Sequence, residues 1–223
     1  EEGKQEVKEE TKLTQEDYDV IVFLTKLVYL DLKFPEPFER KERIDKITGL
    51  RIDIFDMGEY ELFIMCGTNG LNDWIANLKV GLGFIPRQYE QAYFNVKNRM
   101  PESCKPVVIA GHSLGGGLAE YVASNLYYHQ QVICLTFNGC GCSHLIHPIL
   151  RKTDDMFNII TDDDILNSIT RPLSIFGCYM QHTGKVIMVK DKHFFLSVKS
   201  HCNFAAFNKV TVEELYSEVN KDG

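Results

Sequence analysis

The stretch VIAGHSLGGGLAEYVA, residues 108–123, predicts a tight corner between a strand and a helix. Gly111, Ser113 and Gly115 form the pattern G-x-S-x-G directly after an apolar run and directly before a helical pattern. This setting is typical of a nucleophile elbow, in which small neighbours let strand and helix approach closely and the serine takes a strained backbone conformation. We therefore predict that Ser113 is a nucleophile at the carboxyl edge of a sheet.

A glycine-rich phosphate-binding loop is the alternative interpretation of this corner. The stretch has neither the lysine of a Walker loop nor the spacing G-x-G-x-x-G of a dinucleotide-binding turn, so we favour the nucleophile. A helix that begins at Leu114 directs its free N–H groups at the corner. We expect the N–H of Leu114 to stabilise an oxyanion.

Strands and helices alternate outward from the corner. Strands are predicted at residues 50–55, 60–65, 106–110, 131–137, 156–160 and 185–190. Helices are predicted over 87–100 and 114–128 and after the capping residues Thr14 and Thr211. The first helix places on one face Tyr18, Ile21, Val22, Thr25 and Val28. The strand at 50–55 alternates apolar and polar residues, as a half-buried strand does. This order predicts an α/β fold, a mostly parallel sheet with helices on both faces.

Composition predicts one ordinary globular domain. The 223 residues are 44% hydrophobic and 25% charged, and we expect a flexible charged tail over 1–13 before a single domain over 14–223. The net charge of -7, with scattered Lys and Arg, argues against nucleic acid as a partner. No apolar run approaches the roughly 18 residues of a membrane span. The start EEGKQEVKEE lacks the pattern of a secretion signal. A signal could have been removed before this start, so a secreted and a cytoplasmic location both stay open.

The seven cysteines are odd in number, so at least one thiol is free or pairs with another chain. Cys140, Cys142 and His144 are close enough in sequence to suggest a metal site. The chain has no second ligand pair at a spacing typical of zinc, however. We expect buried or surface thiols, and neither a metal nor an organic cofactor.

A serine nucleophile needs a histidine base that is oriented by a carboxylate. Candidate acids follow the strand at 156–160, where Asp162 to Asp164 leave the carboxyl edge of the sheet; a solvated turn is the alternative for most of them. His182 comes before the last strand and is expected at the far edge. His112 flanks the serine and points elsewhere, and the remaining earlier histidines precede the acid. The base is therefore expected to be His193 or His201.

Several stretches resemble, in the same order, segments of the class 3 lipases, whose best-known members are fungal triacylglycerol lipases. They are GHSLGGGLA (111–119), CGTNGLNDWIANL (66–78), GLGFIPRQYEQAYFNV (81–96), TFNGCGCSH (136–144), TDDDILNSI (161–169), QHTGKVIMV (181–189) and SHCNFAAF (200–207). The resemblance implies an α/β-hydrolase fold. It also implies that Ser113 is the nucleophile, Asp164 the acid and His201, in preference to His193, the base. Thr68 matches the second oxyanion residue.

The stretch NGLNDWIANL carries a helical stripe made of Leu71, Trp74, Ile75 and Leu78. A surface helix packed on the core is the alternative from the pattern alone. The resemblance implies a lid, whose apolar face covers the serine in water and turns outward at a lipid surface.

The chain also departs from the lipase pattern. Cys66 stands where the family has an arginine, Gly81 where it has a histidine and Asn167 where it has a proline. Residues 140–143 replace its P-R-V-G segment. These differences leave the expected catalytic residues in place and alter what surrounds them.

The resemblance implies a serine esterase that cleaves lipid esters through an acyl-enzyme, with peripheral contact at a lipid–water interface. Triacylglycerol lipase activity is the first expectation, and a phospholipase A1 or a small-ester esterase is the alternative. A catalytically silent lipase fold that binds lipid or protein is the alternative of another class, and a peptidase is a weaker one. The oligomeric state stays open.

Overall fold

The computed structural model describes residues 11–66, 86–102, 105–126, 131–142, 155–162, 182–190 and 202–217. These residues contain one seven-stranded sheet, whose strands lie side by side in chain order. The strands are β1 (Glu42–Asp45), β2 (Arg51–Asp56), β3 (Glu61–Cys66), β4 (Val107–His112), β5 (Val132–Phe137), β6 (Met156–Thr161) and β7 (Lys185–Val189). The first two pairings, β1 with β2 and β2 with β3, are antiparallel, and every later pairing is parallel.

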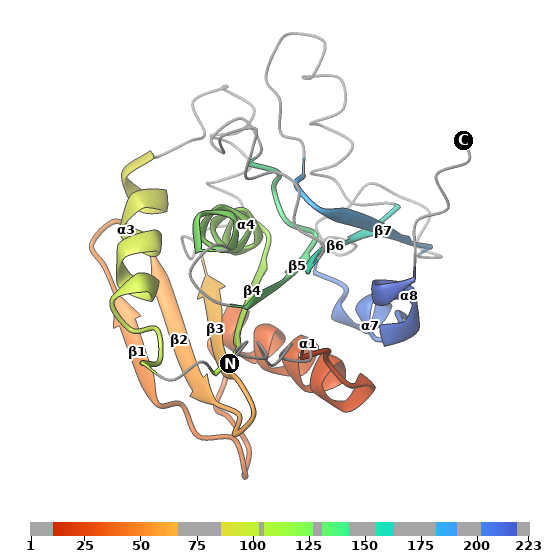
Figure 1. Ribbon diagram of the computed structural model, residues 1–223, viewed down its shortest axis with the longest axis horizontal. Coiled ribbons are helices and arrows are strands. Elements are labelled where there is room, and N and C mark those ends of the chain that lie inside the picture. The colour runs from red at the N-terminus through yellow and green to blue at the C-terminus, as the bar shows by residue number, and fades with distance from the viewer. Residues whose placement is uncertain are drawn as a thin grey trace, which may run out of the picture.

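Helices cover both faces of the sheet (Figure 1). One face carries α3 (Pro86–Lys97) and α4 (Leu114–Leu126), and the other carries α1 (Gln15–Tyr29) and the short helices α7 (Phe204–Phe207) and α8 (Val212–Tyr216). Alternate residues of each central strand point to opposite faces. In β3, Leu62 and Ile64 pack under α1, whereas Phe63 and Met65 pack under α4. The predicted α/β fold with helices on both faces is confirmed.

The helix α1 begins and ends at strong local signals. Thr14 and Asp17 form a complete capping box, in which each side chain receives the other residue's backbone N–H. The predicted apolar face is buried along the whole helix. After Tyr29 the chain leaves the helix through Asp31, whose φ of 52° is left-handed. Thr211 caps α8 with Glu214 in the same way, as predicted.

The strand β2 differs from its sequence-based prediction. Alternation predicted one solvated side, but Arg51 and Asp53 are 5% and 0% exposed. The Asp53 carboxylate is buried because Arg43 and Arg40 pair with it, at N–O distances of 2.7 and 3.3 Å. Charged residues can occupy a buried strand face when another part of the chain supplies their partners.

Residues 11–13 contact the folded chain, although the sequence placed them in the tail. Leu13 is buried, and its N–H donates to the Tyr216 hydroxyl at 3.1 Å. The Thr11 N–H donates to the side-chain oxygen of Gln131 at 3.0 Å. Residues 1–10 lie outside the described residues. Among the helices that are described, none is both long and apolar enough to cross a bilayer.

Candidate active site

Ser113 occupies the corner between two consecutive elements. The strand β4 ends at His112, α4 begins at Leu114, and Ser113 between them has a φ of 58°. A non-glycine residue in this left-handed region is strained. The strained backbone that the sequence predicted is therefore present. Together with the mostly parallel sheet, this corner shows that the chain has an α/β-hydrolase fold.

The glycines of the corner make close approach possible. A Cβ at Gly111 would overlap the Gly115 carbonyl, and a Cβ at Gly115 would overlap the carbonyl oxygen of Met65 at the end of β3. A Cβ at Gly116 would lie 2.7 Å from the Gly139 Cα. Because these neighbours are backbone atoms, they cannot rotate away. Only glycine lets α4 pack this closely against β3 and β4.

Hydrogen bonds hold the backbone of Ser113 from both sides. Its N–H donates to the Phe137 carbonyl at 3.1 Å, and its carbonyl accepts the N–H of Gly116 at 3.0 Å and of Cys140 at 3.1 Å. The Cys140 thiol donates to the same carbonyl at 3.6 Å. Burial raises the pKa of this thiol to about 12, which keeps its proton in place at neutral pH. The segment after β5, which departs from the lipase pattern, thus supports the corner.

The chain that leads to the candidate acid leaves the sheet at the same edge. The Thr161 N–H at the end of β6 donates to the buried Asn138 side-chain oxygen at 2.8 Å, and the Asn138 amide donates to the Thr161 hydroxyl at 3.1 Å. The Asp162 N–H donates to the Val189 carbonyl at 3.0 Å. These bonds join the carboxyl ends of β5, β6 and β7. Asp164 itself lies outside the described residues.

The segment that follows the candidate base packs behind the corner. Cys202 Sγ lies 3.7 Å from the Tyr29 hydroxyl oxygen. The Tyr29 and Phe204 rings contact the ring of His112, with centroids 4.3 and 4.8 Å from it. His112 directly precedes Ser113, and its ring is buried between these aromatics, as expected for a histidine that does not act as the base.

His182 lies at the far edge of the sheet, as the sequence predicted. It directly precedes β7, and its Nδ1 is 3.1 Å from Glu120 Oε2. The Thr183 hydroxyl donates to the same carboxylate at 2.8 Å. Glu120 is fully buried, so these contacts satisfy a carboxylate in the middle of α4.

Most of the other predicted site residues lie outside the described residues. They are Thr68, Leu71, Trp74, Ile75, Leu78, His144, Asp164, His193 and His201. Their roles stay predictions. Cys66, Cys134, Cys140 and Cys142 are buried free thiols. Within the described residues, no group of three or more His, Cys, Asp or Glu could hold a metal ion.

Sequence reasoning missed Arg51. The structure places this arginine beside Cys66, with one guanidinium nitrogen 3.3 Å from Sγ. The signal that could have found it was a basic residue near the start of a strand pattern that is otherwise largely apolar. That signal alone does not show what the residue contacts.

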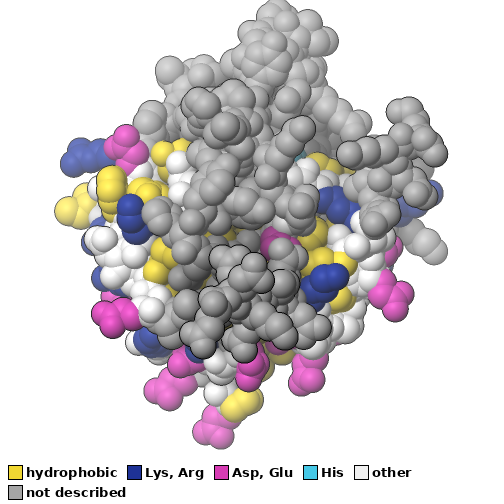
Figure 2. Space-filling model, in the orientation of Figure 1, with side chains coloured by type: hydrophobic (Ala, Val, Ile, Leu, Met, Phe, Trp, Pro, Cys, Tyr) yellow, Lys and Arg dark blue, Asp and Glu magenta, His cyan; other side chains and the backbone are white. Residues whose placement is uncertain are grey.

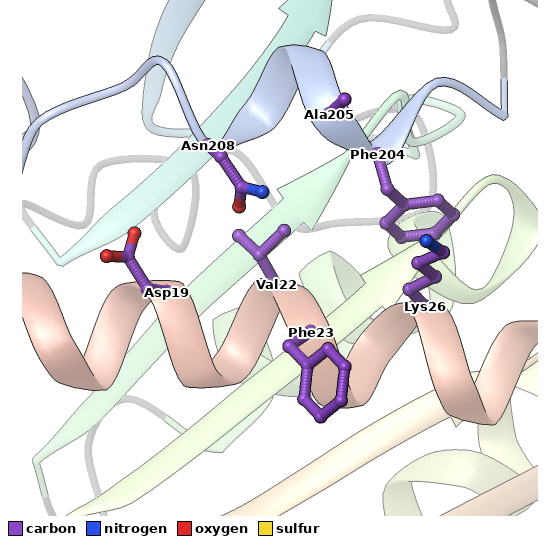
Figure 3. Close-up of a pocket in the computed structure, with 7 residues that line it drawn as sticks. All are labelled: Asp19, Val22, Phe23, Lys26, Phe204, Ala205 and Asn208. Atoms are coloured by element: carbon purple, nitrogen blue, oxygen red, sulfur yellow. The ribbon is translucent and has the colours of Figure 1, made fainter.

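A hollow of about 380 Å³ lies between α1 and α7 (Figure 3). Asp19, Val22 and Lys26 rise from α1 toward Phe204 and Asn208. Ser113 is not among its lining residues. The hollow therefore lies on the face of the sheet that α1 covers and is not part of the corner.

Charges of both signs are mixed among the described residues of the face that Figure 2 shows. On the face in Figure 2, Lys and Arg side chains are interspersed with Asp and Glu. Among the described residues on this face, no concentrated basic patch of the kind that tracks a phosphate backbone is seen.

Comparisons with known proteins agree on one class. The sequence model of the phospholipase-like family, described as the Tle-like phospholipase domain, matches residues 32–151. An extracellular phospholipase A1 of Serratia liquefaciens is 33% identical over 99 residues, which are 44% of this chain and 30% of that protein. The chain thus matches less than a third of the length of this curated relative.

Two solved structures to which the chain has a distant similarity are an esterase/lipase and an esterase. An esterase/lipase from an uncultured bacterium has 9% identity and a TM-score of 0.40, and the alignment covers 92% of each chain. An esterase from the bacterial hormone-sensitive lipase family has 11% identity and a TM-score of 0.36, and the alignment covers 93% of each chain.

Proposed function

The chain belongs to the phospholipase-like family of the Tle-like phospholipase domain, and from this premise we propose that it hydrolyses acyl ester bonds of phospholipids, with Ser113 as the nucleophile. One observation carries the proposal. Ser113 has a φ of 58° at a glycine-lined corner between a parallel strand and a helix. This backbone strain costs about 1–3 kcal/mol, and such strain is concentrated at functional sites.

The proposed reaction is acyl transfer through a covalent intermediate. The Ser113 hydroxyl attacks the ester carbonyl carbon while His201 takes its proton. The resulting tetrahedral oxyanion is stabilised by the N–H of Leu114 and by the N–H and the hydroxyl of Thr68. When the ester bond breaks, His201 returns the proton to the leaving alcohol and the acyl group stays on Ser113. Water then attacks the acyl-enzyme, His201 takes the water's proton, and the fatty acid leaves as the proton returns to Ser113; Asp164 orients the imidazole throughout.

The described neighbours support these assignments. Leu114 is the first residue of α4, so its N–H has no acceptor within the helix. Cys202 follows His201 directly and contacts Tyr29, which packs on His112 beside the nucleophile. Asp164 follows two residues after Asp162, whose backbone is bonded at the carboxyl edge of the sheet. The described neighbours Asp162 and Cys202, together with Leu114, therefore support the roles proposed for Asp164, His201 and the Leu114 N–H.

Phospholipid is favoured over triacylglycerol, which was the first expectation from the sequence. The matching family is phospholipase-like, and the curated relative is named as an extracellular phospholipase A1. The resemblance to class 3 lipases is consistent with either substrate, because the same serine chemistry cleaves the ester bonds of both. Contact with a lipid surface through the stripe around Trp74 is part of this proposal.

Fluorophosphonate labelling of the folded protein tests the nucleophile. We expect covalent labelling of the wild-type protein and of Ser124→Ala, which changes a buried serine on the same helix, and no labelling of Ser113→Ala. Among histidine variants, His201→Ala should lose turnover and His193→Ala should keep it. Fatty acid release from phosphatidylcholine vesicles, compared with a triacylglycerol emulsion, distinguishes the two substrates. An unlabelled but folded wild-type protein would contradict the proposal and favour a silent lipid-binding fold.

A further inference from the structure

Arg51, the first residue of β2, is a buried cation at the edge of the sheet that carries Ser113. It is only 5% exposed. Arginine is rarely buried this far unless its charge and its donors are matched by partners. The partners of Arg51 therefore indicate why the chain keeps it there.

The pairing of Arg51 is incomplete. Its Nη2 donates to the Val28 carbonyl in the last turn of α1 and lies 3.3 Å from Cys66 Sγ. Its Nη1 is 3.4 Å from Asp31 Oδ1, a carboxylate that is 61% exposed and that Arg43 also binds at 2.9 Å. Within the described part of the chain, Nε has no hydrogen-bond partner. A shared, exposed carboxylate compensates little for burying a charge, so stability alone is a weak reason for this residue.

Arg51 lies beside the end of β3, the strand that precedes the proposed oxyanion residue Thr68 in the sequence. In the antiparallel ladder, Arg51 lies directly opposite Cys66, the last residue of β3. On the other side, Gly115 of the elbow helix packs against the carbonyl of Met65. The end of β3 is thus held between the elbow helix and the Arg51 guanidinium, and Thr68 follows two residues later.

The thiol in this contact is a neutral partner. Burial raises the pKa of Cys66, more than the nearby Arg51 lowers it. The thiol stays protonated at neutral pH, so the guanidinium charge is not cancelled by a thiolate. Cys66 also stands where the class 3 lipase pattern has an arginine. A guanidinium reaches this place from the neighbouring strand instead.

We propose that Arg51 is a positioning residue for the oxyanion side of the active site. Its guanidinium joins the end of α1 to Cys66, the last residue of β3, and through Cys66 it acts on Thr68, two residues later in the sequence. This inference rests on the proposed function. It requires that loss of Arg51 impair stabilisation of the tetrahedral oxyanion rather than substrate binding.

The competing explanation is purely structural, because a guanidinium at the Val28 carbonyl also stabilises the C-terminus of α1. Leu24→Ala provides the matched control. Leu24 is a fully buried residue of α1 outside the catalytic machinery, so its truncation weakens the packing of the same helix and leaves the hydrogen bonds of Arg51 in place. If Arg51 acted only through α1, its variants and Leu24→Ala would have the same kinetic behaviour.

The test compares Arg51→Met, Arg51→Lys and Leu24→Ala in the full chain. Melting temperature, kcat and KM on p-nitrophenyl butyrate, and the rate of fluorophosphonate labelling at Ser113 are measured for each. We expect Arg51→Met to lower kcat about 10- to 100-fold with KM within about threefold, and to slow labelling by a similar factor. Arg51→Lys, which keeps the charge, should recover part of this loss. Leu24→Ala should lower the melting temperature and keep kcat within about twofold.

A double variant separates positioning from general damage. When Arg51→Met is combined with Thr68→Ala, the joint loss should be smaller than the product of the two single losses, because both act on the same oxyanion contacts. Should Arg51→Met fold poorly, Arg51→Lys provides the same cycle. Independent, multiplicative losses, or Arg51 variants with the kcat of Leu24→Ala, would overturn the inference. A wild-type protein that is not labelled at Ser113 would overturn the proposed function itself, which is seen before any Arg51 variant is compared.

Discussion

Single residues at the Ser113 corner have little freedom to vary. Ser113 keeps a left-handed φ of 58° because hydrogen bonds from β5 and the following loop hold its backbone on both sides. Gly115 has no such strain, but the Met65 carbonyl occupies the space where its Cβ would be. Ser113 is therefore constrained by its backbone conformation, whereas Gly115, two residues later, is constrained by the lack of space for a side chain.

Gly115→Ala should destabilise the protein by about 3 kcal/mol, because the added methyl group has to displace the end of β3. Gly58→Ala is the matched comparison. Gly58 has a φ of 83°, but no atom lies within 4 Å of the place its methyl group would take, so only the backbone strain of about 1–2 kcal/mol applies. Urea unfolding measures both losses, and fluorophosphonate labelling should be slowed by the Gly115 change alone. Equal losses of stability, with labelling unchanged in both, would contradict this account of the corner.

Among the elements, α1 begins at a capping signal that is visible in the sequence and ends in contact with His112 and Arg51. Its first turn is set by the capping box of Thr14 and Asp17. Its last turn contacts His112 through Tyr29 and Arg51 through the Val28 carbonyl. A helix far from Ser113 in sequence thus contacts the residue that directly precedes Ser113 and the arginine beside the end of β3.

Thr14→Ala should lower the free energy of unfolding by about 1 kcal/mol, because the N–H of Asp17 loses its side-chain acceptor. Thr14→Ser keeps the hydroxyl and should remain within about 0.5 kcal/mol of the wild type. Chemical denaturation monitored by circular dichroism provides both values. Indistinguishable losses in the two variants would show that the cap does not stabilise α1.

At the scale of the whole molecule, buried cysteine thiols and a buried tyrosine hydroxyl determine how stability depends on pH in the alkaline range. Burial raises the pKa of Cys134, Cys142 and Tyr89 well above their ordinary values, and that of Cys140 to about 12. These groups stay protonated in the folded chain. In the unfolded chain the thiols ionise above an ordinary pKa of 9.0. The contribution of these protonated groups to the free energy of unfolding is therefore fully present below pH 9 and is lost as the pH rises from 9 through 12.

The free energy of unfolding should fall by about 1.4 kcal/mol per pH unit for each buried thiol once the pH exceeds 9. Urea unfolding at a series of pH values from 7 to 11 measures this slope. Cys140→Ala removes one of the titrating groups, so its stability should fall less steeply than that of the wild type. Parallel curves for the two proteins between pH 9 and 11 would refute the assignment.

Local patterns in the sequence determined much of this molecule. The G-x-S-x-G corner, both capping boxes and the order of strands and helices depend on residues within a few positions of one another, and the structure confirms them where it describes them. The short strand β1 and the four-residue helix α7 escaped prediction, because elements of this length are held by packing rather than by their own pattern.

Only the tertiary structure decided which distant groups meet. The burial of Asp53, the contact of Arg51 with Cys66 and the packing of Cys202 and Tyr29 behind His112 each join segments that the sequence separates. Periodicity indicates which side of an element is apolar, but not which other element covers that side. The partner that makes a buried charge tolerable comes from strand pairing and helix packing, and these are properties of the whole folded chain.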